Sequence, residues 1–161
     1  MGLDMYLEAR KFVSTYRDKG LLDNLSEALG GIYEAMPVNA RSAEPSGYMT
    51  ISLEAMYWRK ANHIHNWFVQ NVQEGEDDCK PYFVSREKLE SLLADCRKVL
   101  MSGADPEVAQ EILPTASGSF FGGTEYDEYY YEELDTTIKA VEQLLNNEKL
   151  TDCDFYYQAS W

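Results

Sequence analysis

The sequence predicts an α+β domain in which a small antiparallel sheet is packed with four or five helices. Two observations predict the sheet: apolar and polar residues alternate at both ends of the chain, and they alternate again in its middle. A third predicts the helices, because most other apolar residues recur every three or four positions. The 161 residues, 45% of them hydrophobic, favour a single domain over residues 1–161 with a buried core.

Alternation defines the expected strands. Residues 3–10 alternate between apolar and polar side chains, and residues 155–161 do the same. Terminal strands of one chain commonly pair, so we expect the N- and C-terminal strands to be neighbours. Residues 48–54 predict a third strand, and residues 82–84 are long enough only for a short edge strand.

Helical spacing and capping residues define the expected helices. Apolar spacing predicts helices over residues 20–36 and 56–73, and residues 38–47, rich in Pro, Ser, Ala and Gly, predict a loop. The remaining helices have recognisable starts. Ser85 is a cap for a helix over 86–101, Asp105 before Pro106 opens a short helix to about 113, and Thr124 with Asp127 opens the last helix, to about 147.

Charge is concentrated in the last third of the chain. The formal net charge is −14, and residues 104–161 carry 13 acidic side chains against 2 basic ones. Such a field repels nucleic acid and acidic membranes and favours basic protein surfaces. We therefore predict a protein partner with a basic surface, and no direct contact with nucleic acid or membrane.

Cysteine content and hydropathy predict the compartment. The three cysteines are an odd number without Cys-x-x-Cys spacing, which is typical of reduced thiols in a cytosol. No signal-like segment opens the chain, and no apolar run approaches the roughly 18 residues that span a bilayer. We expect a cytoplasmic protein. The sequence carries no signal for its oligomeric state.

One cationic and aromatic segment stands out in this acidic chain. Residues 57–68 contain both histidines and two of the three tryptophans, next to Arg59 and Lys60. On a helix, His63 and His65 lie about 200° apart, so they cannot ligate one metal ion, and we predict no metal site. On the same expected helix, His65 lies on nearly the same face as Trp58, seven residues earlier. His65 is either a proton-transfer or ligand-contact group or a half-buried histidine satisfied by a carboxylate or carbonyl. Arg59 and Lys60 are either a solvated surface or an anion clamp.

Other parts of the chain lack catalytic motifs. The glycines of residues 118–123 match no phosphate-binding or dinucleotide-binding pattern, and no nucleophile motif is present. Glu125 and Asp127 open a helix, where the helix dipole favours acidic residues without any function. We therefore predict no cofactor.

Several motifs spread over the chain resemble one family. They are Met-Gly-Leu-Asp-Met-Tyr-Leu at 1–7, Tyr-Trp-Arg-Lys-Ala-Asn at 57–62, Phe-Phe-Gly at 120–122, Thr-Glu-Tyr-Asp-Glu at 124–128 and Tyr-Tyr-Gln-Ala-Ser-Trp at 156–161, with shorter matches at 64–65, 67–69, 77–79 and 84–86. The chain resembles small proteins encoded by tailed phages and prophages. The resemblance implies a phage accessory protein in the cytoplasm of a bacterial host cell, without an assigned activity. If the motifs converge, one pocket is lined by Asp4, Trp58, Arg59, Asn62, His65, Glu125, Asp127 and Gln158.

Three functions are compatible with these features. The first is a non-enzymatic accessory protein that binds and inhibits a host factor, as in counter-defence, through an acidic surface that mimics nucleic acid. The alternative is a binder of a nucleotide-like small molecule, with Trp58 stacking on a base and Asn62 or Gln158 reading its edges. The third is a hydrolase that uses His65 with Glu125 or Asp127.

Overall fold

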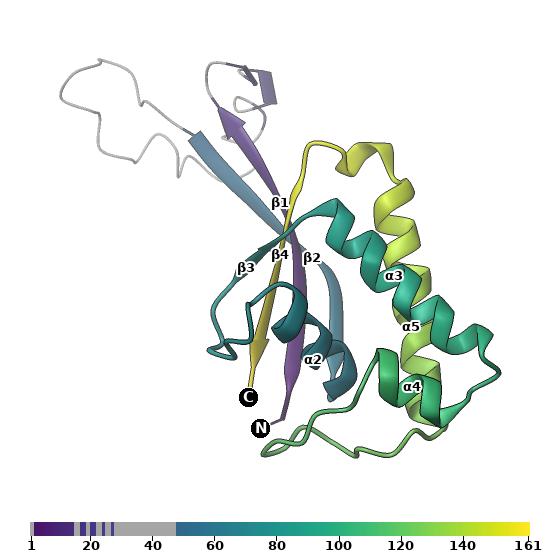
Figure 1. The fold of residues 1–161 in the computed structure, drawn as a ribbon. Coiled ribbons are helices and arrows are strands. Elements are labelled where there is room, and N and C mark those ends of the chain that lie inside the picture. Colours follow the sequence, from purple (N-terminus) through teal and green to yellow (C-terminus); the bar gives the residue numbers. More distant parts are fainter. Residues whose placement is uncertain (1, 15–16, 19, 22–23, 25–26, 28–47) are drawn as a thin grey trace. The chain divides into compact units, whose positions relative to one another are not determined.

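The computed structural model describes residues 2–14, 17–18, 20–21, 24, 27 and 48–161 of the chain (Figure 1). Four strands form one antiparallel sheet in the order β2-β1-β4-β3. The strands are β1 (Asp4–Ser14), β2 (Tyr48–Arg59), β3 (Tyr82–Val84) and β4 (Asp154–Ser160). The N- and C-terminal strands are neighbours, which confirms the pairing expected from their matching alternation.

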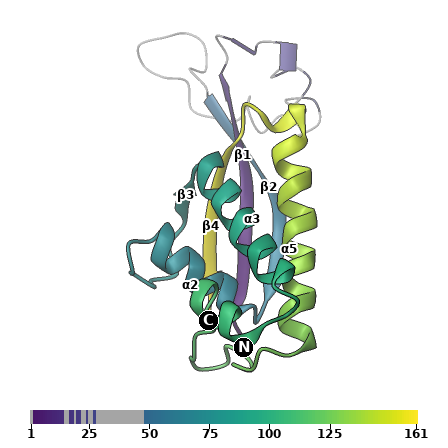
Figure 2. The ribbon, with the colours of Figure 1, turned by 45° about the vertical axis from the view of Figure 1, so that its right-hand side comes forward.

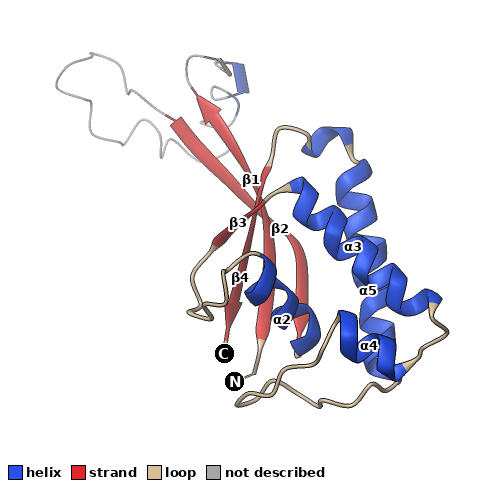
Figure 3. Cartoon of the chain, in the orientation of Figure 1, coloured by secondary structure: helices blue, strands red, loops and turns tan. Residues whose placement is uncertain are grey.

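Four α-helices lie within residues 48–161 (Figure 3), and the described residues 20, 21, 24 and 27 are also helical. The four helices are α2 (Asn62–Asn71), α3 (Arg86–Met101), α4 (Pro106–Ile112) and α5 (Glu128–Asn146), and a 3₁₀ turn, η1 (Glu148–Leu150), follows α5. The predicted α+β class is confirmed. None of the described helices has both the length and the apolar character needed to cross a membrane.

Contacts group the chain into two compact units, one of residues 1–9 and 53–161 and one of residues 10–52. In the second unit, the rings of Phe12 and Tyr48 stack with their centroids 5.4 Å apart, and Val13 is fully buried. Of the predicted helix 20–36, only residues 20, 21, 24 and 27 are described. The predicted loop 38–47 lies outside the described residues.

The core of the first unit lies between the sheet and its helices. The apolar positions of the terminal strands are buried, including Met5 and Leu7 of β1, and Leu3 just before β1 is buried as well. Helices α2, α3 and α5 cover this face of the sheet (Figure 2). A face-to-face stack between Phe68 of α2 and Tyr157 of β4, with centroids 3.8 Å apart, joins the two layers.

The predicted helix over 56–73 is wrong in its first part. β2 continues to Arg59, and α2 begins only at Asn62. The physical reason is that the strand continues past residue 54 and its alternation changes phase: Met49 and Ile51 are partly buried, then Met56 and Trp58 are buried, whereas Tyr57 and Arg59 are exposed. Trp58 therefore projects from a strand into the core and shares no helical face with His65.

The other helix starts follow local capping chemistry. The Ser85 hydroxyl accepts a hydrogen bond from the Lys88 N–H, and the Asp105 carboxylate accepts one from the Glu107 N–H, as predicted. The last helix begins later than predicted. Asp127 is its N-cap because its carboxylate accepts the Tyr130 N–H at 3.1 Å, so Thr124 lies outside the helix.

Candidate functional site

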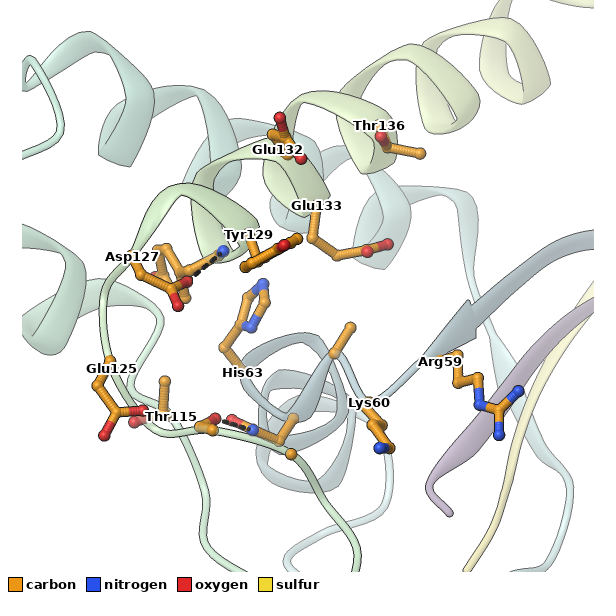
Figure 4. A pocket seen from close by; sticks show the side chains of 15 residues that line it. Arg59, Lys60, His63, Thr115, Glu125, Asp127, Tyr129, Glu132, Glu133 and Thr136 are labelled. Atoms are coloured by element: carbon orange, nitrogen blue, oxygen red, sulfur yellow. Dashed lines mark hydrogen bonds between the residues drawn. The ribbon is translucent and has the colours of Figure 1, made fainter. Parts of the chain in front are cut away.

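A pocket of about 420 Å³ lies between the start of α2 and the start of α5 (Figure 4). Its walls come from three segments that are distant in the sequence: the end of β2 with the start of α2, the connection after α4, and α5. The lining residues are Arg59, Lys60, Ala61, Asn62, His63, Thr115, Gly122, Gly123, Glu125, Asp127, Tyr129, Tyr130, Glu132, Glu133 and Thr136.

A tight junction between β2 and α2 orients the first wall. Lys60 adopts a left-handed backbone conformation with φ of 61°, and its N–H donates to the Leu3 carbonyl at 2.8 Å. Gly122 packs against it with φ of 98°, and a Cβ there would lie 3.1 Å from the Lys60 Cβ. Glycine therefore allows the connection after α4 to approach the junction closely.

Asn62 fastens this connection to α2. Its amide nitrogen donates to the carbonyls of Phe121 at 3.2 Å and Gly123 at 2.7 Å. Its amide oxygen accepts the Ala116 N–H at 3.1 Å. Asn62 lines the pocket, but both ends of its amide are hydrogen-bonded to the backbone of the connection after α4. The side chain therefore positions the pocket wall and is not free to bind a ligand.

His63 is the buried polar group of the pocket. It is 4% exposed, and its ring lies against Tyr130 with the centroids 4.2 Å apart. Its Nε2 has no hydrogen-bond partner among the described residues. Burial lowers the pKa of His63 to about 3, so the ring is neutral at pH 7. A buried polar nitrogen without a hydrogen-bond partner costs ~1–3 kcal/mol of stability, whichever tautomer the neutral ring adopts.

The carboxylates surround His63 from the side of α5. Figure 4 shows His63 pointing from α2 toward Tyr129 and Glu133. Burial raises the pKa of Glu133 above its usual value. Neither Glu132 nor Glu133 makes a hydrogen bond or ion pair with the described residues. These two side chains are therefore open acceptors.

The pocket carries excess negative charge. Two cationic side chains and four acidic ones line it, which gives a formal net charge of −2 with His63 neutral. One oxygen of Asp127 caps α5, and one oxygen of Glu125 accepts the Thr124 N–H at 3.1 Å. Among the described residues, no group of three or more His, Cys, Asp or Glu side chains could hold a metal ion. The pocket therefore suits an organic cation that donates hydrogen bonds.

His65 lies outside this pocket. It is 1% exposed, its Nε2 is 2.9 Å from an Asp77 carboxylate oxygen, and its Nδ1 is 2.8 Å from the Tyr157 hydroxyl. Because a carboxylate only accepts, Nε2 carries the hydrogen and Nδ1 accepts from Tyr157. Both ring nitrogens are satisfied, which matches the structural alternative considered for this residue.

The structure brings together four of the residues predicted to bind a ligand: Arg59, Asn62, Glu125 and Asp127 line the pocket. It does not bring Trp58, His65 and Gln158 to them. Trp58 is 1% exposed and donates its indole N–H to the Thr137 hydroxyl at 2.9 Å, and the Gln158 amide donates to the Cys79 carbonyl at 2.8 Å. Asp4 does not line the pocket: its carboxylate accepts a hydrogen bond from the Tyr57 hydroxyl and lies 3.9 Å from the Arg59 guanidinium.

Sequence reasoning missed the central residues of the pocket: His63, Tyr129, Glu132 and Glu133. A usable signal was the position of His63 four residues after Arg59, the last residue of β2. At the start of a helix it faces a different neighbour from His65, which is half a turn away. That signal depends on locating the end of the strand correctly.

Comparison of the chain with protein-family models, with curated proteins and with solved structures gave no match. The site is therefore interpreted from its own chemistry.

Proposed function

We propose that this protein is a non-enzymatic binding protein that engages the basic surface of a partner through carboxylates on and around α5. The resemblance to phage and prophage proteins suggests the setting: an accessory protein that binds and inhibits a bacterial host factor, as a counter-defence protein does. Net negative charge steers such an encounter over long range, and local carboxylates select the basic surface.

The observation that carries this proposal is the unpaired acidic charge of the C-terminal third. Of its 13 acidic side chains, only Asp135 and Glu142 form salt bridges with described residues, to Lys139 and Arg97. Glu128, Glu132 and Asp135 follow one another at helical spacing, so they lie along one side of α5. A row of like charges on a rigid helix is a reasonable mimic of a phosphate backbone.

The site favours binding over acid–base catalysis. The pKa of His63, about 3, keeps the ring neutral at pH 7, and no carboxylate among the described residues hydrogen-bonds to it. His65 meets Asp77, not Glu125 or Asp127, and neither His65 nor Asp77 lines the pocket. The contacts of the described residues thus give the hydrolase hypothesis no support.

A nucleotide-like ligand is also less suited to this pocket. Trp58 is buried, and its indole N–H is bonded to Thr137, so it offers no free face to a base. The pocket's surplus of carboxylates repels phosphate. The feature that favours a ligand at all, the unpaired acceptor of His63, calls for a donor, which a cationic group supplies.

Capture of host proteins at low and high salt tests the proposal. The test variant Glu128→Gln/Glu132→Gln/Glu133→Gln removes three carboxylates from α5. We expect a basic partner that is retained at low salt, released at high salt, and bound roughly tenfold more weakly by this variant, since three charge contacts are lost.

The matched control is Glu107→Gln/Glu111→Gln/Glu148→Gln. It makes the same change in net charge at exposed positions of α4 and η1 that do not line the pocket. If both variants weaken capture equally, the overall charge and not the α5 surface binds the partner. Retention that is insensitive to salt would contradict the proposal.

A further inference from the structure

A buried ring nitrogen with no hydrogen-bond partner in the described part of the chain lines this acidic pocket. The His63 side chain is 4% exposed, and its Nε2 has no donor among the described residues. Native proteins rarely leave such a group unpaired, so each exception calls for a physical explanation, such as a functional role or a bound molecule. In the neutral tautomer with hydrogen on Nδ1, the Nε2 lone pair can accept one N–H.

The surroundings of His63 supply further acceptors and an aromatic surface. Glu132 and Glu133 make no hydrogen bond or ion pair with the described residues, and Asp127 has one oxygen beyond the one that caps α5. Tyr129, which lines the pocket, is 79% exposed. Figure 4 shows Asp127, Tyr129, Glu132 and Glu133 on the α5 side of His63.

A guanidinium group matches this set better than an ammonium group does. It is planar, always charged, and carries five N–H donors and no acceptor, so it can serve an imidazole nitrogen and a carboxylate at once. It also stacks on aromatic rings while it makes these bonds. An ammonium group concentrates three donors at one strongly hydrated point, which suits acceptors that are spread around a wall less well.

We propose that the pocket between α2 and α5 is a guanidinium-binding site, which receives one arginine side chain of a basic partner protein. This inference rests on the proposed function, because the acidic surface of α5 is what brings such a partner to the pocket. Arginine is enriched among the residues that dominate binding energy at protein interfaces, where it fills enclosed pockets.

Capped tripeptides test the assignment without knowledge of the partner. The probes are acetyl-Gly-Arg-Gly-amide, the same peptide with lysine, the same peptide with citrulline, and free arginine, each titrated into the ¹⁵N-labelled full chain. Citrulline keeps the shape of arginine but lacks its charge. We expect saturable binding of the arginine peptide, with shifts at His63 Nε2 and in the first two turns of α5. The lysine and citrulline peptides should bind roughly tenfold more weakly, the equivalent of one charge-assisted hydrogen bond.

Two variants separate a binding role from a structural one. Glu133→Gln keeps the size of a half-buried side chain, and we expect it to weaken the arginine peptide about tenfold. His63→Phe should abolish the preference for arginine over lysine while it preserves the fold. The control Glu111→Gln, exposed and outside the pocket, should bind the peptide as the unaltered chain does.

The outcomes separate the two proposals. Equal affinity for the arginine, lysine and citrulline peptides, or shifts spread over all acidic surfaces, overturns the guanidinium site even if a basic partner is captured. Tight binding of free arginine that is lost when the arginine is capped in a peptide assigns the site to a small molecule and overturns the partner-arginine proposal. If the arginine peptide binds specifically but no partner is captured in a salt-sensitive way, the proposed function is wrong and the guanidinium-binding site is still supported.

Discussion

The two histidines of α2 lie two residues apart and are equally buried, yet they have opposite chemical surroundings. Both nitrogens of His65 are within hydrogen-bond distance of a partner, Asp77 and Tyr157. His63 stacks on Tyr130, and its Nε2 has no partner among the described residues. Folding has satisfied one imidazole and left the other with an unpartnered ring nitrogen. Burial alone therefore does not distinguish a structural histidine from a candidate binding residue, whereas the hydrogen-bond census does.

Of the substitutions that test this comparison, we expect replacement of His65 to change the free energy of unfolding most. The substitution His65→Phe keeps a ring in the core but leaves the fully buried Tyr157 hydroxyl without its acceptor and Asp77 with only the Trp161 N–H as donor. We expect the free energy of unfolding to fall by ~2–4 kcal/mol. Chemical denaturation at pH 7 measures it. If the free energy of unfolding falls by less than the ~0.5 kcal/mol typical of a surface substitution, the two hydrogen bonds of His65 contribute little to stability.

The next effect is acid sensitivity that belongs to His63. Its pKa falls from 6.5 to about 3 on folding, because burial disfavours the charged ring. The unfolded chain therefore binds a proton below pH 6.5 that the folded chain rejects, and stability that is present above pH 6.5 is lost as the pH falls toward 3. The slope is ~1.4 kcal/mol per pH unit, or about 2 kcal/mol between pH 6.5 and pH 5.

Comparing His63→Phe with the unaltered chain between pH 8 and pH 5 isolates this effect. Phenylalanine cannot titrate, so the two stability curves should diverge as the pH falls, with the variant the more stable. Glu133, which faces His63, acts in the opposite direction: burial raises its pKa, so its contribution favours the folded state at low pH and is lost as the pH rises. Measuring the same curves in a Glu133→Gln background removes this opposing contribution and leaves that of His63. Parallel curves for the unaltered chain and His63→Phe would contradict the burial of a neutral His63.

Much of the fold could be predicted from the sequence, because local patterns determine where its strands and helices begin. Alternation located β1 and β4 and their pairing, and Ser85 and Asp105 marked the starts of α3 and α4. It placed the boundary between β2 and α2 wrongly. Residues 56–59 satisfy both a helical and an alternating pattern, and only the covering helices, which bury Met56 and Trp58, decide between them.

The site was less predictable, because its decisive property is a missing contact. Whether His63 Nε2 or His65 Nε2 finds a partner depends on Asp77 and on the connection that Asn62 fastens, which are 12 or more residues away in the sequence. Nearby apolar spacing drew attention to His65 instead. The acidic residues were visible in the composition, but only the packing of α5 on the rest of the first unit shows that Glu132 and Glu133 share the pocket with His63.

The smallest effect tests the comparison most sharply. At pH 7, His63→Phe removes an unpaired acceptor and keeps a ring against Tyr130, so we expect the variant to be at least as stable as the unaltered chain, by up to ~1 kcal/mol. A satisfied histidine would show the opposite sign, as expected for His65→Phe. His63→Leu, which is smaller than phenylalanine, guards against overpacking of the ring. If both variants lose more than ~1 kcal/mol, His63 has a hydrogen-bond partner in solution and is a structural residue like His65. If His63→Phe raises the free energy of unfolding and lowers the affinity for the arginine peptide, the unpartnered nitrogen of His63 destabilises the fold and serves binding. A functional site is expected to reduce stability in this way.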